Sequence, residues 1–484
     1  MSEAVVEPLS PRRKAIVLGS LCLSLLIVSM DATIVNVAIP SIRADLAATP
    51  TQMQWVIDVY TLVLASLLLL SGATGDRLGR RRTFQVGLSI FALASLLCSL
   101  APNIETLIAA RLLQAIGGSM LNPVAMSIIT QVFTGRVERA RAIGIWGGVV
   151  GISMALGPIV GGALIEYVGW RAVFWINLPI CALAILLAAV FVPESRSASM
   201  RDVDPIGQVL GVTFLFGMVF FLIEGPARGW GEPAVATVGV ITVLAFVAFV
   251  RYEAARADPF VDLRFFRSIP FSSATITAVA AFAAWGAFLF MMSLYLQGQR
   301  GFSAMDTGLI YLPLAVGALI FAPLSGRLVG RYGARPSLLI AGILMTAAML
   351  LLTGLRADTP VWQLLVIFAV FGIGFSTVNA PITNAAVSGM PTDRAGAASA
   401  IASASRQVGV SVGVALCGSV AGAALADPSV DFARAARPLW LLFAGVGVLI
   451  FALGFYSTSP HGLRSAERLA PLIAGPHGGS DGVG

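Results

Sequence analysis

The chain of 484 residues is poor in charge: only 11% of its residues are Asp, Glu, Lys or Arg, whereas 57% are hydrophobic. A soluble domain contains about 25% charged residues. The composition therefore excludes an ordinary soluble protein and indicates a membrane protein. The net charge of +7 arises from 31 basic and 24 acidic residues, and their positions along the chain carry more information than their sum.

Histidine and cysteine are also scarce. The two histidines, His461 and His477, lie near the carboxyl end, so proton handling inside a membrane must depend on other side chains. The four cysteines are widely spaced and include no CxxC pair, which argues against a zinc site or a disulfide framework. Neither a phosphate-binding loop nor a nucleophile–base constellation is evident. We therefore expect no enzyme, no cofactor, no metal and no ATP-driven transport.

Long apolar runs, in contrast, are abundant. Fourteen are long enough to cross a bilayer as helices, and they lack the strict alternation of a β-barrel. The first continues without a cleavage site, so we interpret it as a mature span and not as a signal peptide. The expected spans are residues 15–40, 53–73, 83–101, 105–133, 142–166, 172–193, 205–224, 234–250, 270–297, 308–328, 336–355, 361–388, 396–424 and 437–457.

The distribution of Lys and Arg supports this count. If the amino terminus is cytoplasmic, 22 of the 31 basic residues fall in cytoplasmic segments, seven fall outside and two lie within spans. Short cytoplasmic loops are enriched in Lys and Arg, and one miscounted span would invert the pattern downstream. We therefore predict that both termini are cytoplasmic.

An internal repeat divides the chain. The segment "GATGDRLGRRR" (Gly72–Arg82) is similar to "GRLVGRYGARP" (Gly326–Pro336) at an offset of 254 residues, and "IGGSMLN" (Ile116–Asn122) is similar to "IGFSTVN" (Ile373–Asn379). Two similar halves are typical of transporters that bind substrate between them.

The repeat predicts an all-α integral membrane protein with two six-helix bundles and two accessory helices. The expected segments are a cytoplasmic amino-terminal stretch (1–14), the first bundle (15–200), the accessory helices with a cytoplasmic linker (201–268), the second bundle (269–457) and a disordered cytoplasmic tail (458–484).

Four charged residues lie well inside the expected spans: Asp31, Asp58, Arg111 and Arg406. Because a charge in the membrane is costly, each is a functional candidate. At a rise of about 1.5 Å per residue, Asp31, Asp58 and Arg111 occupy one layer on the outer side of the midplane. Two acids and one arginine at the same depth predict a triad that titrates as a coupled unit and accepts a proton. Two alternatives remain: Asp31 is permanently paired with Arg111, or Asp58 reaches the outer interface.

Arg406 has no acid in the spans of the second half to pair with. Its expected partners are backbone carbonyls, Gln407 or substrate, and together with Asn379 it is a candidate polar site. A structural role and a functional role remain equally open.

Two glycine-bearing segments are candidates for movement. "GPIVGG" (Gly157–Gly162) places Gly157 and Gly161 four residues apart, which allows close helix approach, and Pro158 can kink the span. Simple packing without a gating role is the alternative. The turn "GDRLGRRR" combines basic residues with Asp76 and glycines, and a contact made by this acid could open and close as two halves move.

Five segments together resemble one family. They are "MDATIVNVAIP" (Met30–Pro40), "GATGDRLGRRR" (Gly72–Arg82), "RLLQAIGGSM" (Arg111–Met120), "GPIVGG" (Gly157–Gly162) and "WRAVFWINLP" (Trp170–Pro179). In this order they resemble the motifs of the major facilitator superfamily, in its fourteen-span drug:proton antiporter branch.

The resemblance implies alternating access and export of lipophilic compounds, cationic or neutral, in exchange for protons. It implies a monomeric, multi-pass protein of the cell membrane, whose partners are small molecules, protons and lipid but not nucleic acid. A dedicated exporter of one metabolite or antibiotic, a small-molecule importer and a non-transporting receptor are the alternatives. Asp58 departs from the pattern, since many relatives have a neutral residue there.

The resemblance also implies roles for individual residues. Asp31 becomes the proton-coupling or substrate acid and Arg111 its modulating partner. The implied cytoplasmic gate comprises Asp76, Arg77, Gly79 and Arg81, and the implied antiport hinge comprises Gly157, Pro158, Gly161 and Gly162.

Overall fold

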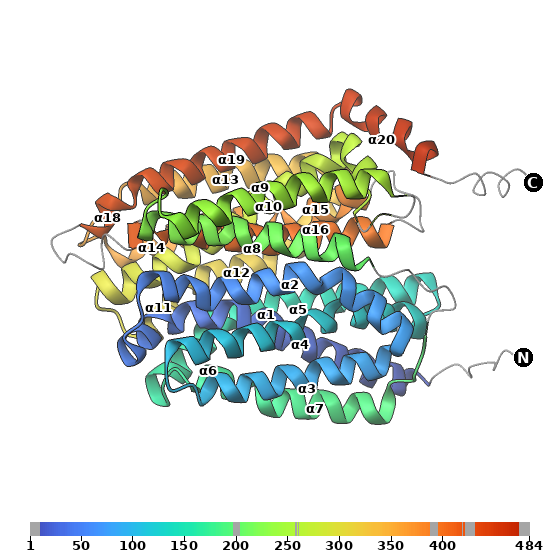
Figure 1. Ribbon diagram of the computed structural model, residues 1–484, viewed down its shortest axis with the longest axis horizontal. Helices are drawn as coiled ribbons and strands as arrows, with labels where there is room; N and C mark the ends of the chain where they lie inside the picture. The colour runs from blue at the N-terminus through green and yellow to red at the C-terminus, as the bar shows by residue number, and fades with distance from the viewer. Residues whose placement is uncertain are drawn as a thin grey trace, which may run out of the picture.

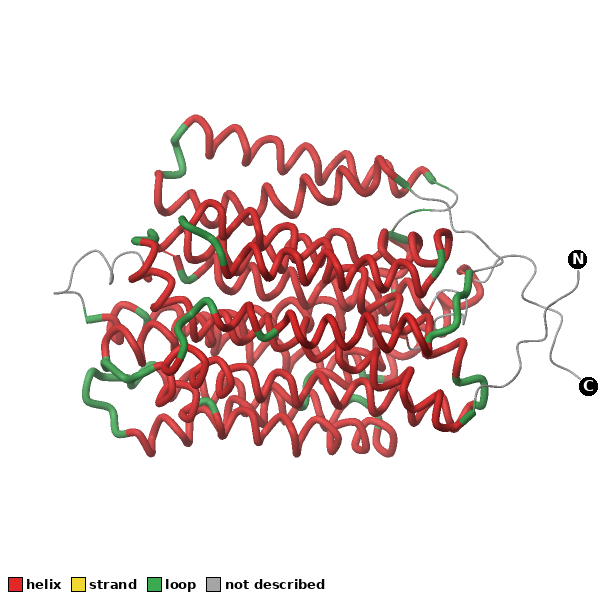
Figure 2. The backbone as a smooth tube through the Cα atoms, turned by 90° about the horizontal axis from the view of Figure 1, so that it is seen from below, coloured by secondary structure: helices red, strands yellow, loops and turns green. Residues whose placement is uncertain are grey.

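The computed structural model describes residues 10–196, 204–256, 259, 261–387, 395–418, 420–421 and 431–473. Within these ranges a few helical side chains, including that of Asp76, lie outside the described part. The regular secondary structure of the described residues is helical throughout, and the long helices run side by side along one axis (Figures 1 and 2). We call the end of the bundle where α1 begins the proximal end, and the end where α1 ends the distal end.

The first half of the chain forms seven helices. They are α1 (Pro11–Leu46), α2 (Pro50–Leu78), α3 (Arg80–Ser99), α4 (Ile104–Val132), α5 (Arg136–Tyr167), α6 (Ala172–Trp175) and α7 (Asn177–Phe191). Helix α1 packs against α5 and α7, and α4 packs against α2 and α3. These helices, blue to teal, fill the lower part of Figure 1.

A helical pair and a second group of helices follow. The pair is α8 (Pro205–Arg228) and α9 (Pro233–Ala255), followed by the 3₁₀ helix η1 (Leu263–Arg267). The second group is α10 (Ile269–Ser293), the π-helical η2 (Leu294–Gln299), α11 (Ala304–Ile310), α12 (Leu312–Tyr332), α13 (Arg335–Leu352), α14 (Val361–Ser376), α15 (Asn379–Val387), α16 (Ala395–Leu416), α18 (Phe432–Ala435), α19 (Arg437–Ser457) and α20 (Pro460–Ile473).

Local chemistry sets where several helices begin. Thr49 and Gln52 form a reciprocal capping box before α2, with Pro50 at the first helical position. The side chain of Ser268 accepts a hydrogen bond from Phe271 N at the start of α10. These caps satisfy backbone N–H groups that a helix leaves unpaired at its first turn.

Within the described residues, eleven helices are long and apolar enough to cross a membrane. The other three expected spans, 53–73, 142–166 and 396–424, overlap α2, α5 and α16. Burial differs strongly between helices. Of an apolar stretch of 18 residues, 89% is buried in α10–η2, but only 22% in α8 and 17% in α9. The α8–α9 pair therefore lies at the periphery, with most of its surface available to lipid.

The repeat found in the sequence has a structural counterpart. Helix α2 ends immediately before Gly79 (φ +111°), and α12 ends immediately before Gly333 (φ +76°). Both residues occupy the region of positive φ that favours glycine. The equivalent glycines therefore stop equivalent helices at the proximal end of each half.

The expectation of a disordered tail from residue 458 is wrong for its first part, because residues 460–473 form α20. Ala466 and Leu469 are buried on one face of this helix, which packs against α10, α19 and η1. Apolar residues at helical spacing outweigh the Gly and Pro content that suggested disorder. Residues 474–484 lie outside the described part of the chain.

Candidate functional site

A buried polar network lies where α1, α3, α4 and α7 meet. The Arg111 guanidinium forms an ion pair with Asp31 Oδ2 and donates from Nη1 to Gln114 Oε1 at 2.7 Å. Gln114 in turn donates from Nε2 to Asp31 Oδ1 at 3.0 Å. The side chain of Arg111 is 1% exposed and that of Asp31 is 0% exposed. The expected pairing of Asp31 with Arg111 is therefore present, in a closed three-residue ring.

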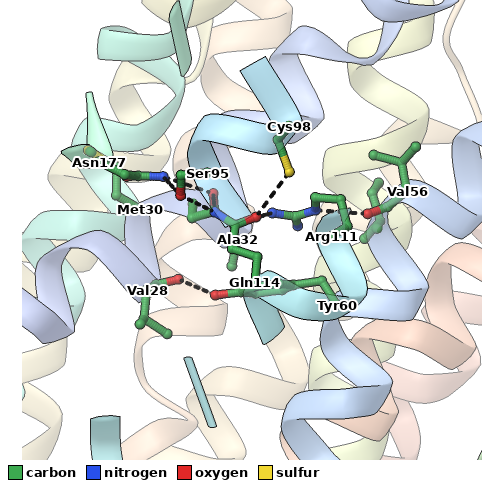
Figure 3. Close-up of polar contacts among 12 residues, drawn as sticks. Val28, Met30, Ala32, Val56, Tyr60, Ser95, Cys98, Arg111, Gln114 and Asn177 are labelled. Carbon is green, nitrogen blue, oxygen red and sulfur yellow. Dashed lines mark hydrogen bonds and ion pairs between the residues drawn. The ribbon is translucent and has the colours of Figure 1, made fainter. Parts of the chain in front are cut away.

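Helix α2 supplies further partners for the cation. Arg111 Nε donates to the carbonyl oxygen of Val56 at 3.1 Å, and its guanidinium carbon lies 4.1 Å from the centre of the Tyr60 ring (Figure 3). The ring of Phe174 lies 5.9 Å away on α6. Acceptors and aromatic faces thus stabilise a cation that burial would otherwise destabilise.

Three residues of this network were not predicted from the sequence. Gln114 follows Arg111 by three positions and therefore shares its face of α4. Ser95 on α3 accepts from Gln114 Nε2 at 2.9 Å and from Asn177 Nδ2 at 3.3 Å, and Asn177 also donates to Asp31 Oδ1 at 3.4 Å. Polar residues within otherwise apolar helices were the available signal.

Asp58 does not join this network, so the predicted triad of two acids and one arginine is wrong in its third member. Val56 and Tyr60 face Arg111, whereas Asp58 lies about 200° around the helix from Val56, at about 100° per residue. Depth along the membrane placed the three charges in one layer, but direction around α2 separates them.

Asp58 instead faces α16 of the second half. The side chain of Asp58 is 0% exposed. Within the described residues neither of its carboxyl oxygens has a hydrogen-bond partner, although the Ser411 hydroxyl lies next to the carboxyl group. Thr61 contacts Ser411 directly through its hydroxyl, and Gln54 Nε2 donates to Val414 O at 2.6 Å. Asp58 is thus a buried acid in a polar seam between the two halves.

Helix α8 covers this seam from outside. Val219 and Ile223 of α8 pack with Leu62 of α2 and Ala415 of α16. A polar anchor adds to the packing, since Trp55 Nε1 donates to Glu224 Oε1 at 3.0 Å. An accessory helix therefore lies against both halves next to Asp58.

The predicted gate segment is mostly helical and not a loop. Asp76 and Arg77 belong to the last turn of α2, and Gly79 alone separates α2 from α3. The positive φ of Gly79 permits this abrupt turn. The side chain of Asp76 lies outside the described residues, so its contacts stay a prediction.

An acid that the sequence analysis overlooked holds this turn. Glu194, just after α7, accepts hydrogen bonds from Arg81 N at 3.1 Å and Ser195 N at 3.0 Å. Its other carboxyl oxygen lies 3.9 Å from Arg81 Nε and 3.7 Å from Arg82 Nε. Glu194 therefore caps the start of α3 and ties it to the end of α7.

The glycines predicted as a hinge lie at two close helix contacts. A Cβ added at Gly161 would lie 2.6 Å from Ile34 Cγ1 on α1, and one added at Gly162 would lie 2.5 Å from Ala304 O on α11. Gly157 faces Thr33 of α1 at even closer range. Helix α5, with Pro158 in its interior, thus approaches both halves of the molecule closely.

The halves contact each other in the distal part of the bundle. Ser293 Oγ donates to Asn36 O at 2.7 Å, and Gln297 Nε2 donates to Val37 O at 2.9 Å. These bonds join α10 and η2 of the second half to α1 of the first. Together with the α5–α11 contact and Gln54, they close the molecule at the distal end.

Arg406 lies between α10, α15 and α16. It donates from Nη2 to Thr383 Oγ1 at 2.7 Å and from Nη1 to Ser403 Oγ at 3.4 Å, and its guanidinium carbon lies 6.0 Å from the centre of the Phe282 ring. Within the described residues it forms no ion pair, and no hydrogen bond joins it to Gln407 or Asn379. The predicted polar site thus contains Arg406 but has Thr383 as its principal partner.

The described residues contain no group of three or more His, Cys, Asp or Glu side chains that could hold a metal ion. What the site offers is an acid paired with a buried arginine in one half and a second acid in the seam between halves. Apolar helices, two structurally related halves and charges buried within them define a multi-pass membrane transport protein.

The chain belongs to the Major Facilitator Superfamily, whose family model matches residues 21–414. The multidrug resistance protein Stp of Mycobacterium tuberculosis is 35% identical over 401 residues, which cover 83% of this chain and 74% of that protein. The tetracenomycin C resistance and export protein of Streptomyces glaucescens is 35% identical, covering 84% and 76%. The multidrug efflux pump LfrA of Mycolicibacterium smegmatis is 33% identical, covering 85% and 81%.

Solved structures agree at the level of the fold. A bacterial homologue of the human lysosomal transporter Spinster, in an inward-facing and unoccupied conformation, superimposes with a TM-score of 0.64 at 18% identity, covering 95% of this chain and 99% of that one. The family model and the relatives named above confirm the expected family and the cell-membrane location. The family is one of transporters, not of catalytic enzymes.

Proposed function

We propose that the protein exports lipophilic small molecules, antibiotics among them, from the cell in exchange for protons. The observation that carries this proposal is the Asp31–Arg111–Gln114 ring, a titratable acid held by a cation inside the membrane. Relatives named for multidrug resistance, antibiotic resistance and efflux support the substrate class. The proton gradient is the driving force, and the working unit is a monomer without a cofactor.

The proposed topology has fourteen spans with both termini in the cytoplasm. Helices α2, α5 and α16 complete the eleven long apolar helices. The beginning of α1 and the end of α19 share the proximal end (Figure 1), and 22 of the 31 basic residues fall in sequence segments expected to be cytoplasmic. The proximal end is then cytoplasmic, and the contacts at the distal end close the molecule toward the outside.

In the proposed cycle, substrate enters an inward-facing state from the cytoplasm or the inner leaflet. A proton from outside neutralises Asp31 when the site opens outward, and this weakens its attraction to Arg111. Arg111 keeps Val56 O and Gln114 Oε1 as hydrogen-bond acceptors. The network around Asp31 can therefore rearrange while the guanidinium stays hydrogen-bonded. Rocking of the two halves about the α5 glycines then changes the side of the membrane to which the proton and substrate sites are open.

Asp58 is proposed as a second proton site. A carboxylate without a hydrogen-bond donor in a buried seam is costly, whereas a protonated acid can donate to the adjacent Ser411 hydroxyl. The seam between α2 and α16 would then close around the neutral acid and open when the proton leaves. Protonation of Asp58 would thus be linked directly to contact between the halves.

The substrates are proposed to be neutral or cationic, although Arg406 adds a positive charge in the second half. A dedicated exporter of one antibiotic would use the same machinery with narrower selectivity, and the relative named for tetracenomycin C favours it as a second candidate. An importer is disfavoured, because the Stp protein is named for multidrug resistance and the tetracenomycin C relative for resistance and export.

The test uses purified protein in liposomes with an imposed proton gradient and a fluorescent lipophilic substrate such as ethidium. Wild type is expected to transport ethidium against the proton flow. Asp31→Asn should abolish gradient-driven transport, and Asp58→Asn should reduce it. Asp358→Asn is the matched control, because this exposed acid lies in the loop between α13 and α14.

Each result bears on a separate part of the proposal. Gradient-driven transport by Asp31→Asn at the wild-type rate would overturn the role of Asp31. Wild-type behaviour of Asp58→Asn would remove the second proton site only. Failure of wild type on ethidium, a neutral drug and an antibiotic alike would overturn export itself.

A further inference from the structure

A positively charged pocket lies at the proximal end, outside the helices that form the Asp31 and Asp58 sites. Its volume is about 270 Å³. It is formed by η1 and by α20, and its lining residues are Arg267, His461, Arg464, Ser465, Arg468 and Leu469. No carboxylate is among these lining residues. Neither the proposed transport cycle nor the family motifs involve this pocket.

The pocket is built by the way α20 docks. Ala466 and Leu469 are buried on the face that packs against the bundle. Ser465 Oγ accepts a hydrogen bond at 2.9 Å from Ile269 N, the first residue of α10. This bond fixes the rotation of α20 about its axis and its position along that axis. The basic residues of α20 therefore lie next to η1.

The basic side chains converge from two segments almost 200 residues apart. Arg464 and Arg468 lie four positions apart on one stripe of α20, and His461 precedes Arg464 by about one turn. Arg267 faces them from the end of η1. All four are exposed, and within the described residues none of the three arginines forms an ion pair. Glu467 is also on α20 but does not line the pocket.

This donor set suits a phosphate group. A guanidinium offers planar pairs of N–H donors that match phosphate oxygens, and three of them can contact one anion from different sides. Ser465 adds no donor, because its hydroxyl already donates to Gly462 O at 2.6 Å, and the buried side chain of Leu469 closes the pocket on the side of the bundle. The arrangement is a basic site of the size and chemistry of a phosphate group, at the position where a lipid head group would lie.

The position of α20 is consistent with such a ligand. Helix α19 ends at Ser457, and α20 follows directly at the proximal end of the bundle (Figure 1). An amphipathic helix with a basic polar face at the end of a span lies at the depth of lipid head groups. Basic residues near an anionic leaflet attract its lipids.

We propose that the pocket between η1 and α20 binds a phosphate group, carried either by an anionic lipid head group or by a soluble phosphate. Arg267, Arg464 and Arg468 supply the charge, and Ser465 positions α20. Occupation of the site would join α20 to the segment between the accessory helices and α10. The inference is independent of proton coupling and of substrate identity.

The test measures binding to the purified full-length chain in detergent by native mass spectrometry. The probes are phosphatidylglycerol, phosphatidylcholine and inorganic phosphate. Wild type is expected to retain phosphatidylglycerol in preference to phosphatidylcholine if the source is a lipid, or to retain inorganic phosphate if the source is soluble. The double variant Arg464→Gln/Arg468→Gln should weaken binding of the preferred probe about thirtyfold, the effect of two basic residues near an anionic surface.

The matched control is Arg327→Gln/Arg331→Gln, which removes two exposed arginines four residues apart at the proximal end of α12. It should bind the preferred probe as wild type does. Thermal unfolding of both double variants checks that each is folded, and Arg464→Lys/Arg468→Lys should retain part of the binding if one fails to fold. Equal binding by wild type and Arg464→Gln/Arg468→Gln for all probes would overturn the proposal, as would equal losses in the control.

Discussion

Removing the cation of the buried pair should cost more stability than removing both charges. In Arg111→Gln, the carboxylate of Asp31 stays fully buried with only two amide donors, Gln114 Nε2 at 3.0 Å and Asn177 Nδ2 at 3.4 Å. Breaking a buried ion pair by removing one partner typically costs about 3–5 kcal/mol, because an uncompensated charge is left behind. We expect Arg111→Gln to lie in this range.

The opposite single substitution should be milder. In Asp31→Asn, the guanidinium of Arg111 retains Val56 O, Gln114 Oε1 and the face of the Tyr60 ring. The expected cost is about 1–3 kcal/mol, that of a perturbed buried hydrogen bond. The double variant contains only neutral amides, so it should recover roughly 2 kcal/mol relative to Arg111→Gln alone.

The assay is thermal unfolding of the four purified proteins in one detergent at a fixed heating rate, followed by tryptophan fluorescence. Wild type is expected to have the highest unfolding temperature and Arg111→Gln the lowest, with Asp31→Asn and the double variant between them. A double variant that unfolds below Arg111→Gln would refute the reasoning, because it would show that charge compensation does not determine stability here. Gradient-driven transport should stay absent from the double variant, which separates folding from proton coupling.

Two other contacts give testable changes. Gly162→Ala should destabilise by about 1–3 kcal/mol, because its Cβ would meet the backbone oxygen of Ala304 at 2.5 Å; Gly445→Ala, with open space around it, should be neutral or slightly stabilising, and equal unfolding temperatures for the two would contradict this. Glu194→Ala should cost about 0.5–2 kcal/mol by uncapping α3 at Arg81, measured by the same unfolding assay, and an unchanged transition would show that the cap is dispensable.

The helices and the repeat could be predicted because both depend on local sequence. A run of about 20 apolar residues has few alternatives to a helix in a membrane. The offset of 254 residues between the two similar segments identifies Gly79 and Gly333 as equivalent. Both residues adopt a positive φ where their helices end. The pairing of Asp31 with Arg111 followed from their depth together with the scarcity of other charges.

Partners that depend on rotation about a helix axis could not be predicted in this way. Gln114, Ser95 and Asn177 come from three helices, and their convergence depends on how α3, α4 and α7 pack. Glu194 was overlooked because it lies just beyond a span, where an acid is unremarkable until its contact with Arg81 is known. In each case the missing information was tertiary.

Asp58 shows what the structure adds to the function. Depth alone made it a third member of the Asp31–Arg111 site, but its direction on α2 places it in the seam with Ser411 of α16. Asp58 lies between the two halves, whereas the partners of Asp31, namely Arg111, Gln114 and Asn177, all belong to the first half. Because α8 packs over the same seam and its Glu224 accepts a hydrogen bond from Trp55, α8 shields Asp58 from lipid. Loss of the hydrogen bond between Trp55 and Glu224 should therefore change the surroundings of Asp58 and leave those of Asp31 unchanged.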